Sequence, residues 1–80
     1  MSTAEAQEVK DLLLQSNDHY RQLSERHHEL DDRLHQLSSL PHLSESEHFE
    51  EVTLKKRKLA LKDRMERMAL DYARAHYKSS

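Results

Sequence analysis

Seven histidines and the carboxylates near them are the side chains with the most obvious capacity for chemistry. His28 and Asp32 are four residues apart, as are Asp31 and His35, so on a helix each pair shares a face and could hold a divalent metal ion. A catalytic zinc site needs three protein ligands and a structural site needs four. We therefore expect no metal site and no cofactor here, and the same holds for the other histidines, His19, His27, His42, His48 and His76.

Catalysis is not expected either. The chain has no cysteine and no glycine, which excludes a thiolate nucleophile, a disulfide framework and a glycine-rich phosphate loop. No serine or threonine is arranged with a base, and long helices offer no deep substrate pocket. We predict a protein that is not an enzyme.

A basic segment at residues 55–67 is the other candidate site. It contains seven bases and two acids, and its bases are Lys55, Lys56, Arg57, Lys58, Lys62, Arg64 and Arg67. They wrap around a helix without aromatic residues between them for base stacking. The favoured interpretation is a surface that is salt-bridged internally to Glu25, Glu29, Asp31 and Asp32; the alternative is a nucleic-acid-associated regulator that binds phosphates through this segment.

The elements that position these residues are predicted by two heptad patterns. Residues spaced alternately four and three apart run from Val9 to Leu37 (Val9, Leu13, Ser16, Tyr20, Leu23, His27, Leu30, Leu34 and Leu37). This unbroken period predicts one helix over about residues 3–38, begun by a capping box at Ser2 and Glu5 or by Thr3 as a competing cap.

A turn at residues 39–44 and a second helix complete the chain. Pro41 disfavours helix at the residue before it, and Ser44 with Glu47 forms a capping box that begins a helix over about 45–77. The seam of this helix is Leu54, Lys58, Leu61, Met65, Met68, Tyr72 and Ala75. The fold class is thus all-α, with residues 1–80 forming one antiparallel two-helix hairpin resembling a coiled coil.

Apolar residues outside both seams predict a second contact surface. Val52, Leu59 and Leu70, here called the outer stripe, lie about 150° around the second helix from its seam at 100° per residue. A two-helix hairpin covers each seam residue from one side only and buries little apolar area. We therefore expect a homo-oligomer, a helical bundle formed through this stripe, and an unidentified protein partner; scattered surface leucines are the alternative.

Polar residues also occur within the seams. His27, Asp31 and Lys58, here called the polar seam, lie within about one turn of one another in a hairpin. A lysine at a core position needs a carboxylate or a route to solvent, so we expect Lys58 to reach Asp31 or Glu25, and His27 to stay near Asp31. Such residues fix the register of leucine seams in coiled coils, and a histidine can also make a contact pH-sensitive.

Charge and hydropathy indicate the cellular location of the protein. The net charge is −2, with excess acid in residues 1–40 and excess base in residues 41–80, which suits a chain that folds back on itself. No apolar run approaches the length of a membrane span, and the first residues lack the pattern of a signal peptide. We expect a cytoplasmic protein without a membrane partner.

Two segments resemble the YdcH family, small bacterial helical-hairpin proteins of unknown function. They are His27-x-x-Leu30-Asp31-x-x-Leu34 and Leu54-Lys55-Lys56-x-Lys58-Leu59-x-Leu61-Lys62-Asp63-x-Met65. The resemblance covers roughly residues 20–72. It implies a helical hairpin in the bacterial cytoplasm, and it supplies no catalytic residues. The sequence as a whole predicts a non-enzymatic protein that acts through helix–helix contacts.

Overall fold

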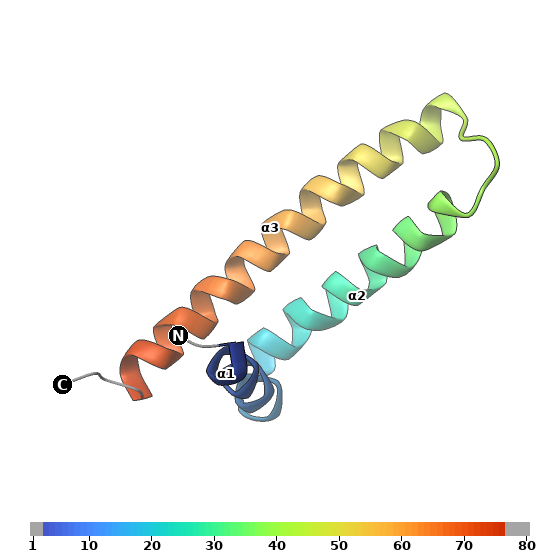
Figure 1. Cartoon of the computed structure of the whole chain (residues 1–80). Coiled ribbons are helices and arrows are strands. Elements are labelled where there is room, and N and C mark those ends of the chain that lie inside the picture. The colour runs from blue at the N-terminus through green and yellow to red at the C-terminus, as the bar shows by residue number, and fades with distance from the viewer. Residues whose placement is uncertain (1–2, 77–80) are drawn as a thin grey trace.

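The structure, a computed structural model, describes residues 3–76 and contains three α-helices. They are α1 (Thr3–Ser16), α2 (Asp18–Ser38) and α3 (Glu45–His76). α2 and α3 lie side by side and run antiparallel, while α1 packs across their open end (Figure 1). The molecule measures 54 × 21 × 17 Å. The all-α prediction is confirmed, but three helices replace the predicted pair.

The continuous helix expected over residues 3–38 is wrong, because the chain bends at Asn17. This residue has an extended backbone (φ −125°, ψ 108°) and acts as the N-cap of α2. Its side-chain oxygen accepts a hydrogen bond from the Tyr20 backbone N–H at 2.9 Å. Asparagine is among the best N-cap residues because its short side chain reaches these otherwise unsatisfied amides.

The C-terminus of α1 is satisfied by side chains next to the bend. The Arg21 guanidinium donates to the carbonyl oxygens of Leu14 and Gln15 at 3.0 and 3.3 Å, and the Ser16 hydroxyl donates to Leu12 O at 2.7 Å. The last carbonyls of a helix lack partners within the helix. At this bend the Leu14 and Gln15 carbonyls of α1 and the Tyr20 N–H of α2 therefore have side-chain partners.

The bend brings α1 onto the end of the α2–α3 pair and creates the main core. Val9 and Leu13 of α1, Tyr20 of α2, and Ala69 and Ala73 of α3 form one buried cluster. Small alanine side chains allow α1 to approach α3 closely. The buried face of α3 is therefore the one that carries Ala69 and Ala73. Of the predicted seam residues, Met65, Met68 and Tyr72 are half-buried at the edge of the cluster, and Ala75 is exposed.

The start of α3 follows the sequence prediction. The Ser44 N–H donates to the Glu47 carboxylate at 2.9 Å, and the Glu47 N–H donates to the Ser44 hydroxyl at 3.2 Å. These reciprocal bonds confirm the capping box, and they hold the pKa of Glu47 below its ordinary value. The cap predicted at Ser2 and the predicted end at residue 77 lie outside the described residues.

Replacement of Asn17 tests the bend. Asn17→Ala removes the side-chain acceptor for the Tyr20 N–H, so the free energy of unfolding should fall by about 1 kcal/mol in urea titrations. Asn17→Asp keeps an acceptor and is the matched control, which should stay close to the wild type. An Asn17→Ala variant as stable as the wild type would show that the cap does not hold the bend.

Candidate functional site

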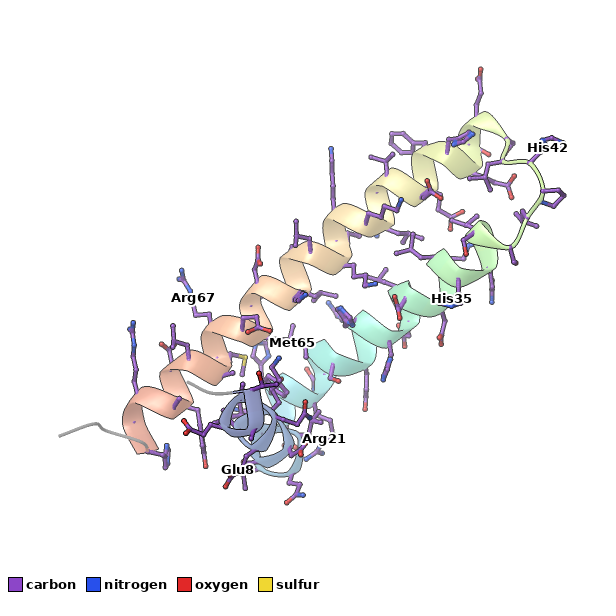
Figure 2. All side chains as sticks on the ribbon, viewed as in Figure 1. Glu8, Arg21, His35, His42, Met65 and Arg67 are labelled. Atoms are coloured by element: carbon purple, nitrogen blue, oxygen red, sulfur yellow. The ribbon has the colours of Figure 1, made fainter. Side chains whose placement is uncertain are left out.

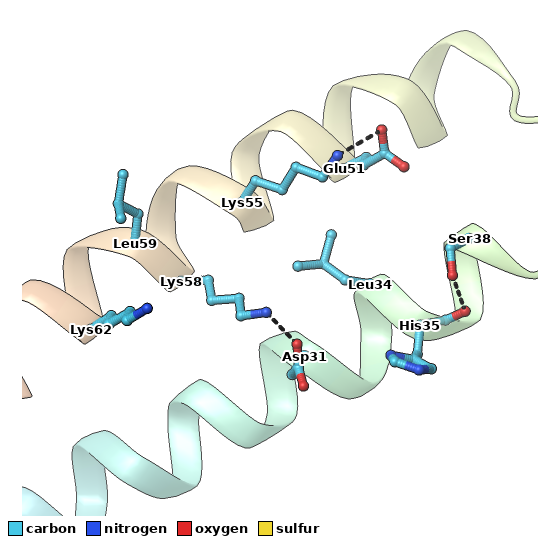
Figure 3. A pocket seen from close by; sticks show the side chains of 9 residues that line it. All are labelled: Asp31, Leu34, His35, Ser38, Glu51, Lys55, Lys58, Leu59 and Lys62. Carbon is cyan, nitrogen blue, oxygen red and sulfur yellow. Dashed lines mark hydrogen bonds and ion pairs between the residues drawn. The ribbon is translucent and has the colours of Figure 1, made fainter. Parts of the chain in front are cut away.

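The polar seam lies on one side of the α2–α3 pair, and its central contact is an ion pair. The Lys58 ammonium donates to the Asp31 carboxylate, as the sequence predicted (Figure 3). The Lys58 and Asp31 side chains are 34% and 40% exposed. The Lys58 side chain therefore extends from the seam toward solvent, where its ammonium contacts Asp31. The hydrogen bond from Lys58 holds the pKa of Asp31 below its ordinary value.

His27 is half-buried beside this pair. Burial lowers the pKa of its imidazole, and the nearby Lys58 ammonium lowers it further. Asp31 acts in the opposite direction, whereas His28 and Lys62 act with Lys58. His27 is therefore near Asp31 as expected, but burial and the lysines dominate its electrostatics.

An open groove of about 600 Å³ contains the ion pair. Asp31 and Leu34 of α2 form one wall, and Lys55, Lys58 and Lys62 of α3 form part of the other. Leu59 borders the groove, with its side chain pointing away from α2 (Figure 3). Across residues 3–76, no three His, Cys, Asp or Glu side chains come together to hold a metal ion. The groove thus combines three lysines with two carboxylates and apolar side chains.

The outer stripe is exposed on α3. Val52, Leu59 and Leu70 are 51%, 60% and 45% exposed. Figure 2 shows the same orientation at labelled positions, because Arg67 projects away from α2 while Met65 points toward it. Phe49 is 75% exposed one turn before Val52. Phe49 was not predicted as part of the stripe. Its spacing of three residues from Val52 is the feature of the sequence that indicates it.

The basic segment is less neutralised than the sequence predicted. Lys58 pairs with Asp31 across the helices, and Lys55 pairs with Glu51 within α3 at 3.6 Å. The other five bases form no ion pair with any described residue; they are Lys56, Arg57, Lys62, Arg64 and Arg67. An internally salt-bridged surface is therefore wrong for most of the segment, since Glu25, Glu29 and Asp32 form no ion pair with it.

Two of the unpaired bases line a second groove on α2 and α3. Arg57 and Arg64 of α3 and Arg26 of α2 surround an open volume of about 460 Å³ with Leu30 and Leu61 among its other lining residues. Glu29 also lines this groove without pairing to an arginine. Guanidinium groups bind carboxylates and phosphates through paired hydrogen bonds, so this groove is the part of the surface best suited to an anion.

The described residues form a small all-helical protein. No helix within residues 3–76 has the length and apolarity needed to cross a membrane. The chain belongs to the family described as "Protein of unknown function (DUF465)", whose model matches residues 21–69. The match covers most of α2 and most of α3, and α1 lies outside it. It agrees with the expected family of unknown function; the YdcH name itself stays a prediction.

The other comparisons add no relative. No curated protein and no solved structure matches the chain.

Two substitutions of Lys58 test the ion pair. Lys58→Leu should leave the midpoint of urea unfolding unchanged or raise it, because an apolar side chain fits the seam and the half-exposed Asp31 remains solvated. Lys58→Glu should lower the midpoint, because it places a carboxylate against Asp31. Equal midpoints for the two variants would contradict an electrostatic contact at this position.

His27 predicts a pH dependence with a defined direction. Its pKa in the folded protein lies below the ordinary value of 6.5, so unfolding takes up a proton between these two values. Stability from His27 is then complete above about pH 6.5 and decreases as the pH falls through that value. His27→Gln should flatten the change in unfolding free energy between about pH 7 and pH 5.

His48 is exposed, and His48→Gln is the control for this measurement. It should keep the wild-type slope of unfolding free energy against pH. A slope that is the same in the wild type and His27→Gln would show that His27 does not couple to folding.

Proposed function

We propose that this chain is a non-enzymatic interaction protein whose outer stripe packs against a helix of another protein molecule. The observation that carries the proposal is the exposure of Val52, Leu59 and Leu70 along one side of α3. Aligned apolar side chains on a helix surface form the kind of face that pairs with another helix. Contiguous exposed apolar patches on soluble proteins commonly mark interaction sites.

Stability also favours this use of the stripe. The main core contains five buried residues around α1, and only three further residues of α2 and α3 are buried, namely Leu23, Leu37 and Leu54. Further contact along α3 would remove apolar surface from water at about 25 cal/mol per Å². Association through the stripe would then add to the stability of a fold with a small core.

Cross-linking tests whether the stripe contacts protein. A photo-reactive amino acid at Arg67, beside the stripe, should yield protein adducts in cells that survive nuclease treatment. Leu59→Asp should reduce their yield at least fivefold, because it places a charge in an apolar contact. Leu61 is a half-buried seam residue, so Leu61→Ala should lower the unfolding free energy by about 1–2 kcal/mol, below the range of about 2–5 kcal/mol for a fully buried leucine, and should keep the adducts.

Leu40→Asp is the matched control for Leu59→Asp. Leu40 is also an exposed leucine, at 43%, but it lies in the connection between α2 and α3. Its substitution should leave the adducts intact. Equal yields from Leu59→Asp and the wild type would contradict a role for the stripe.

Nucleic-acid binding is the second candidate function, and the groove of Arg26, Arg57 and Arg64 favours it. RNA or DNA affinity should then fall steeply with added salt. Arg57→Gln should weaken it several-fold, whereas Arg74→Gln, on α3 outside the groove, should have little effect. Weak binding at low salt that ignores both substitutions would remove this candidate.

A further inference from the structure

The outer stripe belongs to a longer heptad pattern on the outside of α3. Phe49, Val52, Lys56, Leu59, Asp63 and Leu70 are spaced 3, 4, 3, 4 and 7 residues apart, and all six are exposed. Heptad spacing of this kind places side chains along one seam of a helix that pairs with another helix. α3 therefore carries two seams, one toward α1 and α2 and one toward the outside.

The two charged residues of the outer seam are opposite in sign and unpaired. Neither Lys56 nor Asp63 forms an ion pair with another described residue. They cannot satisfy each other within one helix, because seven residues separate them by about 10 Å along the axis. Both side chains are exposed, so a second molecule can reach them.

The positions of these residues have a common centre. The midpoint between Lys56 and Asp63 falls between Leu59 and Ala60, and so does the midpoint between Phe49 and Leu70. A two-fold axis through that point would place Lys56 opposite Asp63 of a second copy, and Phe49 opposite its Leu70, each contact occurring twice. A parallel pair would instead place Lys56 against Lys56 and Asp63 against Asp63.

We infer that the outer stripe binds a second copy of this chain, antiparallel along α3, with the two-fold axis near Leu59 and Ala60. This inference rests on the proposed function and names the partner. The shape of the molecule agrees with it, because α1 widens only the end of the molecule that holds the C-terminus of α3 (Figure 1). Antiparallel pairing places that wide end beside the narrow end of the other copy.

Charge exchange tests the pairing by sedimentation equilibrium of the purified chain. Lys56→Glu and Asp63→Lys each replace two attractive contacts with two repulsive ones, so each variant alone should dimerise at least tenfold more weakly than the wild type. The double variant Lys56→Glu/Asp63→Lys should dimerise like the wild type. A mixture of the two single variants should form heterodimers, because both of their contacts are then between opposite charges.

Asp32→Lys, which reverses an exposed charge on α2, is the control and should leave dimerisation unchanged. Helix content by circular dichroism identifies any variant that fails to fold. If one single variant does not fold, the other single variant and the double variant decide. A wild-type chain that is monomeric at high micromolar concentration would overturn the inference, as would single variants that dimerise normally or a mixture without heterodimers.

Cross-linking separates this failure from failure of the proposed function. If the chain is monomeric but Leu59→Asp still abolishes adducts with another protein, the inference falls and the proposed function stands. If Leu59→Asp leaves the adducts unchanged as well, both fall.

Discussion

The bend at Asn17 is the constraint on which the rest of the structure depends. Two antiparallel helices cover each other's apolar residues from one side, which limits the area that a chain of this length can bury. Capping at Asn17 turns α1 back so that Val9 and Leu13 cover Tyr20 and Ala69. The chain thereby supplies its own third helix, and the largest buried cluster forms where all three helices meet.

Placement of α1 also determines which surfaces remain available. α1 packs at the open end, and the ion pair of Lys10 with Glu66 at 3.0 Å joins it to α3. Leu59 and Phe49 lie outside that contact and stay exposed. The same arrangement leaves Arg57 and Arg64 without carboxylate partners among the described residues. The apolar outer stripe and these two bases thus lie on different sides of α3.

Local signals were predicted from the sequence, and the non-local arrangement was not. The capping box of Ser44 with Glu47 depends on residues three apart, and Lys58 meets Asp31 because a lysine in an apolar seam needs a carboxylate or a route to solvent. The bend was missed because the heptad spacing continues through it to Tyr20. Asn17 is a favoured N-cap residue in the middle of this period, and it indicated the start of a new helix. The unbroken spacing on both sides of it indicated one continuous helix instead.

The most direct test of this account is a nuclear Overhauser measurement between the Val9 methyl groups and the Tyr20 ring. Along a straight helix these residues are separated by about 16 Å, which is beyond the reach of the effect. Both belong to one buried cluster in the bent chain. The account predicts cross-peaks between them, or between the ring and Leu13 packed beside it. Their absence, together with helical connectivities running unbroken through Asn17, would contradict the bend and the three-helix core built on it.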